Sequence, residues 1–194
     1  MPNDAPALLD RFMPTYAVRG RHQITVRAPA ALVMQVARNF DIESIWLVRT
    51  LFSLRARLLG APAPPQQRDG FLDQMQKIGW GCLAEDPAQY FIAGAACRPW
   101  QADPGFSPVA PELFATFSEP DQVKIVWTLE ANEIALALTR FATETRAEPT
   151  DETARIQFKS YWRKFGAGII LIRLVLLPAI RKRAEQMWRE RPEP

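Results

Sequence analysis

The segment from Thr150 to Pro194 carries the pattern that most constrains the fold of this chain. Thr150 or Asp151 can cap a helix, because either side chain can accept a hydrogen bond from a free backbone N–H group. Helical spacing then places four aromatic residues along one side: Phe158, Tyr161, Trp162 and Phe165. An aliphatic stripe follows, formed by Ile169, Ile172, Leu176 and Ile180. We expect one long C-terminal helix, kinked or broken where Gly166 and Gly168 separate the two stripes.

Alternating apolar and polar residues predict strands before this helix. Residues 20–27 place His22, Ile24 and Val26 on one face, as in a half-buried strand. Two hairpins are predicted further along, the first from 79–85 and 89–98, the second from 123–130 and 134–148 with its turn at 131–133. Between the hairpins, the four prolines of 99–111 exclude a central strand or a helix interior, so we expect a stiff loop.

Two helices are predicted between the first strand and the hairpins. Pro29 fits the first position of a short helix, and Asp41 can cap a longer one that ends at Gly60. The longer helix is apolar over most of its circumference, which predicts burial on more than one side or contact with an apolar space. Plain core packing fits the pattern equally well.

The order of elements indicates an α+β fold in which an antiparallel sheet wraps the terminal helix. The chain has 194 residues, of which 48% are hydrophobic and 23% charged, typical of one globular domain. We therefore interpret residues 1–194 as a single domain.

The net charge of +3 arises at the C-terminal end, where residues 150–194 hold ten Lys and Arg against five Asp and Glu. Such a cluster is usually a solvated helix face, so we expect no nucleic-acid partner, while contact with a membrane surface stays open. The apolar run 165–180 contains Arg173 and Pro178 and is too short for a membrane span. The N-terminus has no signal-like apolar run, and two distant cysteines predict reduced thiols, so a cytoplasmic location is expected.

Few residues suggest catalysis. His22 is the only histidine, so any catalytic triad or multi-histidine metal site would have to include it, and a structural role is the simpler interpretation. The sequence lacks the glycine-rich motifs of dinucleotide and P-loop sites. We predict neither a cofactor nor a metal.

Several segments resemble the SRPBCC superfamily, whose START-like or birch-pollen-allergen-like fold is called helix-grip. The resemblance lies in Thr143 to Arg146 on the last strand and in Ala154, Arg155, Phe158, Tyr161, Trp162, Ile172 and Arg173 on the helix. Upstream, ITVRAPAALVMQVA (24–37) resembles the first strand and helix of the family, and GAACRPW (94–100) a strand end of some members. It covers roughly residues 16–189, and the order of the segments is more specific than any one of them.

This resemblance implies a curved antiparallel sheet of about six to seven strands around a long C-terminal helix, with two short helices after the first strand and a deep apolar cavity. Members of the superfamily bind or carry lipids, sterols or polyketides, and some cyclise or dehydrate polyketides. The fold alone does not select among these activities.

Nine residues are candidates for a ligand site. Trp127, Leu129, Phe158, Tyr161, Trp162 and Phe165 fall on apolar faces and are able to line a cavity, with the Tyr161 hydroxyl as a polar group, and Trp100 fits its mouth. Core packing accounts for these aromatic residues about as well. Arg140 and Glu144 share one side of their strand: facing inward they would form an acid–base pair, facing water a weak surface ion pair.

We interpret the chain as a binder of a small hydrophobic molecule, such as a lipid, sterol or polyketide, in an interior cavity without covalent chemistry. Two alternatives stay open at this point: a cyclase or dehydratase that uses the same cavity, and a lipid-transfer protein whose basic helix end meets anionic headgroups. The oligomeric state is not predicted.

Overall fold

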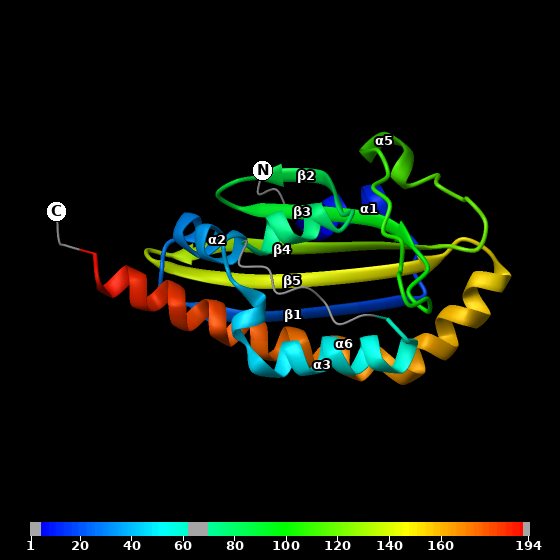
Figure 1. The fold of residues 1–194 in the computed structure, drawn as a ribbon. Coiled ribbons are helices and arrows are strands. Elements are labelled where there is room, and N and C mark those ends of the chain that lie inside the picture. Colours follow the sequence, from blue (N-terminus) through cyan, green and yellow to red (C-terminus); the bar gives the residue numbers. More distant parts are fainter. Residues whose placement is uncertain (1–4, 62–69, 192–194) are drawn as a thin grey trace.

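The computed structural model describes residues 5–61 and 70–191. Within them, one antiparallel sheet has five strands in the order β1-β5-β4-β3-β2 (Figure 1). The strands are β1 (Val18–Val26), β2 (Gly81–Asp86), β3 (Tyr90–Cys97), β4 (Val123–Ala135) and β5 (Leu138–Pro149). The longest strands, β4 and β5, pair at the centre, and β1 joins β5 with His22 opposite Thr143.

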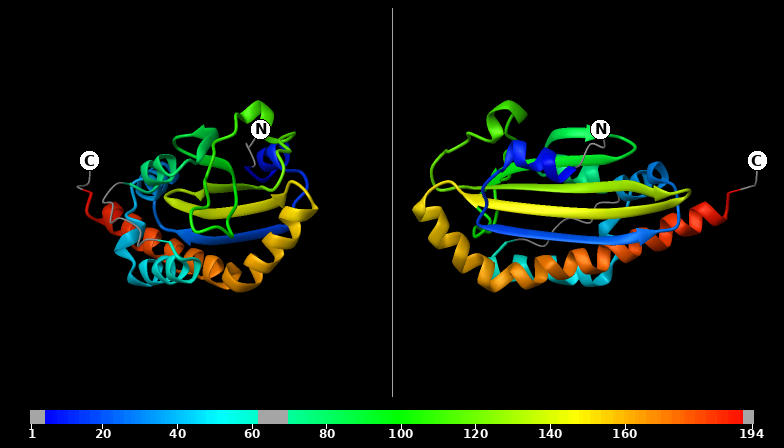
Figure 2. Two further views of the ribbon diagram at one scale, coloured as in Figure 1. Left: turned by 45° about the vertical axis from the view of Figure 1, so that its right-hand side comes forward. Right: turned by 180° about the vertical axis from the view of Figure 1, so that it is seen from behind.

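Helices cover the concave side of this sheet. They are α2 (Ala30–Arg38), α3 (Trp46–Leu59), α4 (Phe71–Lys77) and α6 (Glu152–Arg189). Helix α6 runs along the sheet as one long, curved element, and α3 lies beside it (Figures 1 and 2). The α+β class, the curved antiparallel sheet and the long C-terminal helix are thus confirmed.

The main core fills the space between the sheet and these helices. Strand alternation turns Val26, Leu129 and Phe141 towards α2 and α6, where they join Val33 and Leu177. All five side chains are at most 2% exposed. Burial of such aliphatic and aromatic side chains supplies most of the free energy of folding.

A second, smaller core lies on the convex side of the sheet. It is covered by α1 (Ala5–Phe12) and α5 (Pro111–Phe114), two helices that the sequence patterns did not predict. Leu9 and Met13 pack there with Phe114, Ile92 and Val126. Because both faces are covered, the central strands are buried on both sides: in β4, Val126 and Thr128 are fully buried on the convex side and Leu129 is 2% exposed on the concave side.

Four sequence expectations need correction. The described part of the sheet has five strands, and not six to seven. The second hairpin turns at Leu136 and Ala137 rather than at 131–133, with Ala137 at φ 52° and a register shift after Glu133. The Asp41 cap starts a short 3₁₀ turn, and α3 begins separately at Trp46. Of the kink or break expected at Gly166 and Gly168, the break is absent, because helix α6 continues through both residues.

Other expectations hold. Both cysteines are free, and the first hairpin and the short helix after Pro29 lie where predicted. Residues 99–110 contain neither helix nor strand, apart from an isolated bridge between Ser107 and Ala96. None of the helices in the described ranges is both long and apolar enough to cross a bilayer.

Candidate functional site

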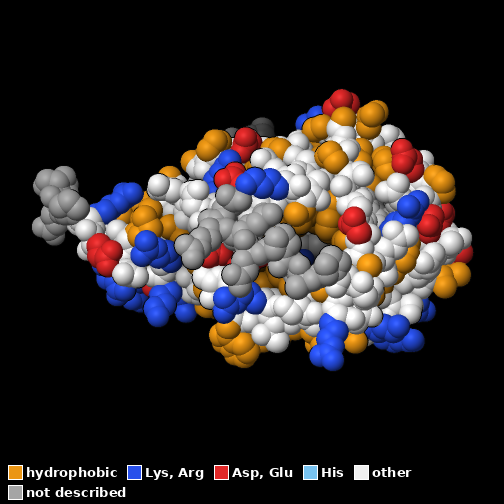
Figure 3. Space-filling model, in the orientation of Figure 1, with side chains coloured by type: hydrophobic (Ala, Val, Ile, Leu, Met, Phe, Trp, Pro, Cys, Tyr) orange, Lys and Arg blue, Asp and Glu red, His pale blue; other side chains and the backbone are white. Residues whose placement is uncertain are grey.

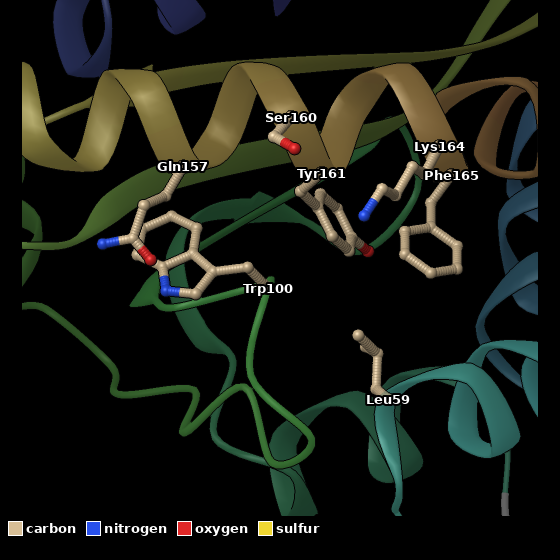
Figure 4. Close-up of a pocket in the computed structure, with 7 residues that line it drawn as sticks. All are labelled: Leu59, Trp100, Gln157, Ser160, Tyr161, Lys164 and Phe165. Atoms are coloured by element: carbon tan, nitrogen blue, oxygen red, sulfur yellow. The ribbon is translucent and has the colours of Figure 1, made fainter.

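An open pocket of about 310 Å³ lies where the first half of α6 meets the end of α3 and the loop after β3 (Figure 4). We call it the Tyr161 pocket. It is lined by Leu59, Trp100, Gln157, Ser160, Tyr161, Lys164 and Phe165. The five α6 residues follow the helical spacing of i, i+3, i+4, i+7 and i+8, so one face of α6 forms a whole wall.

The apolar surface of the pocket comes from three elements. Tyr161 and Phe165 pack with ring centroids 5.0 Å apart, and Tyr161 also stacks with Phe158. Trp100 belongs to the same aromatic cluster, and Leu59 projects from α3 on the opposite side (Figure 4). This cluster exists because the aromatic side of α6 docks near the end of the sheet where β3 leads into the proline-containing loop.

Arg55 holds the three elements of the pocket together. From α3, its Nε donates a hydrogen bond to the Tyr161 hydroxyl at 3.3 Å, and its Nη2 donates to the Pro99 carbonyl at 3.1 Å. The guanidinium therefore fixes the distance between α3, α6 and the loop that carries Trp100. It also places a positive charge next to the pocket.

Each polar side chain of the pocket can donate a hydrogen bond, and one of them, Lys164, is a cation. Lys164 extends its ammonium group towards the space beside Tyr161, and Ser160 and Gln157 lie on the same wall (Figure 4). The seven lining residues include one cation and no carboxylate. With Arg55 close by, the pocket favours a ligand whose polar end is an anion or a strong hydrogen-bond acceptor.

The structure separates the predicted aromatic residues into two groups. Trp100, Tyr161 and Phe165 line the pocket, while Phe158 and Trp162 pack behind it in the same cluster. Trp127 and Leu129 lie apart from them in the main core, among Phe71, Trp80 and Phe91. Helical spacing from Tyr161 and Phe165 was the signal that could have found Gln157, Ser160 and Lys164.

Arg140 and Glu144 lie on the convex face, away from α6. Arg140 is exposed, whereas Glu144 is fully buried, so they form neither an inward acid–base pair nor a surface ion pair. Arg19 and Arg146 each donate to Glu144 at 2.8 Å. Burial by itself would raise the pKa of Glu144, but hydrogen bonds from Arg19 and Arg146, and their charges, hold that pKa below its usual value.

Glu144 belongs to a balanced charge network that we call the convex-face network. Within this network Arg21 contacts two carboxylates, Glu130 at 2.8 Å and Glu144 at 3.2 Å. Arg146 also contacts Asp10 at 2.6 Å. The Thr128 hydroxyl donates a hydrogen bond to Glu130 at 2.8 Å. Three arginines thus meet three carboxylates beneath α1. Such full pairing of charges indicates a structural role.

On the concave face, Arg173 lies outside this network. Arg173 of α6 points towards β5, and its guanidinium donates to the Thr145 hydroxyl. Burial lowers the pKa of Arg173 to about 10. The pKa of His22 is lowered as well, first by burial and then by the Arg173 charge. Among the described residues Arg173 has no carboxylate within 4.0 Å, and its sequence signal was a single charge inside an apolar run.

Comparison with known proteins adds little. No protein-family model matches the chain, and no curated protein does. One solved structure, the Zhui aromatase/cyclase from Streptomyces sp. R1128, is similar with 13% identity and a TM-score of 0.29, over 87% of this chain and 94% of that chain. A similarity of this size carries no functional weight, so function is inferred below from the geometry of this chain.

Proposed function

We propose that this protein binds a small apolar molecule with an anionic group in the Tyr161 pocket, without covalent chemistry. The observation that carries the proposal is the pairing of an apolar wall with polar lining residues that include a cation and no carboxylate. Trp100 and Phe165 supply apolar surface, and Lys164 supplies a positive charge at the same pocket. Sites for small molecules commonly combine such an apolar lining with a few placed polar groups.

The size of the pocket limits the ligand. Its volume of about 310 Å³ is at the small end of the range of roughly 300–1,000 Å³ for ligand sites. A compact aromatic or short-chain acid fits this space better than a sterol or a long-chain lipid. A polyketide-like acid remains within the proposed class.

The enzymatic alternative depended on Arg140 and Glu144 as an acid–base pair that faces the ligand. A cyclase or dehydratase needs an acid or base within hydrogen-bond reach of its substrate. Glu144 and Arg140 lie on the other side of the sheet, and no carboxylate or histidine lines the Tyr161 pocket. We therefore propose binding and not catalysis.

Two dyes of matched shape test this proposal. Anilinonaphthalene sulfonate is an aromatic anion, and phenyl naphthylamine has the same rings without the charge. We expect the anion to bind more tightly, with one site per chain. Lys164→Met should weaken anion binding about tenfold, the effect of one charge-assisted hydrogen bond, and leave the neutral dye unaffected. Lys159→Met is the matched control, since Lys159 is exposed on the same helix outside the pocket.

A pocket-blocking variant separates this site from other apolar surface. Ser160 is exposed and lines the pocket, so Ser160→Trp should fill the space without disturbing the core and abolish the binding of both dyes. Dye binding that is unchanged in Ser160→Trp, or an equal effect of the Lys159 and Lys164 substitutions, would show that the ligand site lies elsewhere.

A further inference from the structure

Helices α3 and α6 expose large apolar side chains to solvent on the side away from the sheet. We call this surface the α3–α6 face. On α3 it comprises Trp46, Leu54 and Leu58, with exposed fractions of 67%, 51% and 64%. On α6 it comprises Ile170, Leu171 and Leu174, with exposed fractions of 38%, 37% and 52%.

The exposed residues of α3 lie opposite its buried side. Val48 and Ala56 are at most 6% exposed and face the core. Trp46, Leu54 and Leu58 share the other half of the helical circumference with Arg49 and Arg57. Part of the apolar circumference of α3, for which burial on more than one side was one expectation, is therefore a solvent-facing surface.

Helix α6 repeats this arrangement. Between Lys164 and Arg181, every exposed position is apolar or small: Ala167, Ile170, Leu171, Leu174 and Pro178. The one charge in this stretch, Arg173, turns inward to Thr145. An ordinary surface helix would carry polar residues at these positions.

The two surfaces are neighbours. Helices α3 and α6 run side by side on one side of the sheet in both views (Figures 1 and 2). They touch near Gly168, where a Cβ would lie at the ordinary contact distance of 3.6 Å from the Leu51 side chain. The exposed rows of the two helices therefore lie close enough to form one face.

The charges that α3 and α6 themselves place around this face have a single sign. Helix α3 contains no Asp or Glu, and α6 contains none between Glu152 and Glu185. Cations border the apolar residues, including Arg49 and Arg57 on α3 and Arg163, Arg181 and Lys182 on α6. Along the lower edge of Figure 3, hydrophobic side chains lie between Lys and Arg side chains.

We propose that the α3–α6 face docks on the surface of an anionic lipid bilayer. Apolar side chains that insert below the headgroups, bordered by Lys and Arg that meet lipid phosphates, are the features of helices that lie in a membrane interface. A nucleic acid would satisfy the cations but leave Trp46 and Leu54 without apolar partners. A second copy of this chain would bring like charges together across a two-fold interface.

This proposal goes beyond ligand binding and does not require it. None of the six residues that define the face lines the Tyr161 pocket. The pocket nevertheless opens between the same two helices, with Leu59 next to Leu58 and Lys164 next to Arg163. A docked protein would therefore hold its pocket close to the headgroup layer.

Vesicle sedimentation tests the proposal. We expect the full-length protein to bind vesicles of phosphatidylcholine with phosphatidylglycerol, to bind poorly to phosphatidylcholine alone, and to dissociate as salt is raised. The combined substitutions Leu54→Gln, Leu58→Gln, Leu171→Gln and Leu174→Gln should reduce binding at least about tenfold by removing apolar contact. The fold should survive, since all four side chains are more than a third exposed.

The matched control replaces exposed apolar residues elsewhere. Leu113, Ile134 and Leu136 have exposed fractions of 57%, 50% and 97% and lie outside α3 and α6. Their combined replacement by Gln should leave vesicle binding unchanged. Ser160→Trp should also bind vesicles like the parent protein, which separates this proposal from the proposed ligand site.

Three results would overturn the docking proposal. One is the absence of binding to anionic vesicles at low salt. Another is tight binding to a DNA or RNA oligonucleotide that the Leu→Gln substitutions leave intact, while vesicles are not bound. The third is a dimer in light scattering that the same substitutions dissociate, because the face would then be an interface between two copies.

Discussion

At the scale of single residues, Glu144 illustrates why a strand pattern cannot assign a role to a charge. The sequence showed that Glu144 and Arg140 share one face of their strand, but it did not show which side of the sheet that face lies on. The decisive partners, Arg19 and Arg146, come from another strand and from the next position on the same face of β5. Only the fold brings them together, and it does so beneath α1, a helix without a clear sequence signal.

Substitution of Glu144 should destabilise the protein. Glu144→Gln removes the charge that Arg146 and Arg19 share, while Arg146 remains 97% buried and keeps Asp10 as its carboxylate partner. We expect the free energy of unfolding to fall by about 3 kcal/mol, as for other broken buried pairs. Chemical denaturation measures the change, and Arg140→Gln, at an exposed position of the same strand, should alter it by less than about 0.5 kcal/mol. Equal effects of the two substitutions would contradict the structural role of Glu144.

His22 should make stability depend on pH. Burial and the Arg173 charge lower the pKa of folded His22, so below its unfolded pKa of about 6.5 the unfolded chain binds the proton more readily. The free energy of unfolding should therefore fall as pH is lowered from about 7.5 to 5.5. Denaturant titrations at several pH values in this range measure the free energy of unfolding, which should change less with pH in His22→Gln than in the parent protein. The same dependence of the free energy of unfolding on pH in both proteins would mean that the pKa of His22 is not lowered in the folded state.

At the scale of elements, the sequence predicted the helices and strands that have a periodic hydrophobic pattern and missed those that lack one. The long α6, the hairpin of β2 and β3 and the helix after Pro29 follow from periodicity and caps. Helix α1 is one of the shorter helices and packs on the convex face through Leu9 and Phe12, and no periodic pattern in the sequence predicts it. The β4–β5 turn was misplaced because Leu136 and Ala137 are not typical turn residues, whereas Asn132 and Glu133 interrupt the apolar alternation.

The arrangement of elements also explains which residues of the candidate site could be predicted. Tyr161, Phe165 and Trp100 were predictable because large aromatic residues on one helix face and beside a loop need an apolar environment. Arg55 and Lys164 were not, since only the crossing of α3 and α6 brings these charges to the aromatic cluster. The exposure of Leu54 and Leu58 could not be predicted either, because a row of apolar residues does not show whether another element covers it.

The packing of α5 on β3 gives an element-scale prediction. A Cβ at Gly94 would lie 2.5 Å from a Phe114 ring carbon and 2.6 Å from a Leu83 methyl carbon. Gly94→Ala should therefore lower the free energy of unfolding by about 1–3 kcal/mol through overpacking. In a Phe114→Leu background, which provides space, the same substitution should cost less. Thermal or chemical denaturation of the four proteins measures this coupling, and additive effects would contradict the contact.

At the scale of the whole molecule, the two faces of the sheet serve different purposes. The convex face is closed by a small core and a paired charge network, which fit a structural role. The concave face carries the main core, the open Tyr161 pocket and, beyond α3 and α6, an apolar surface bordered by cations. The proposed ligand binding and bilayer docking thus both belong to the layer formed by α3 and α6.

Native mass spectrometry of the protein purified from its own host tests the central claim most directly. The parent protein should carry one small acidic molecule per chain, which denaturation releases for identification. Ser160→Trp, purified in the same way, should carry none, because its indole occupies the Tyr161 pocket. A parent protein without any bound molecule that also stays empty after incubation with aromatic and short-chain acids, or the same molecule bound to Ser160→Trp, would contradict the account.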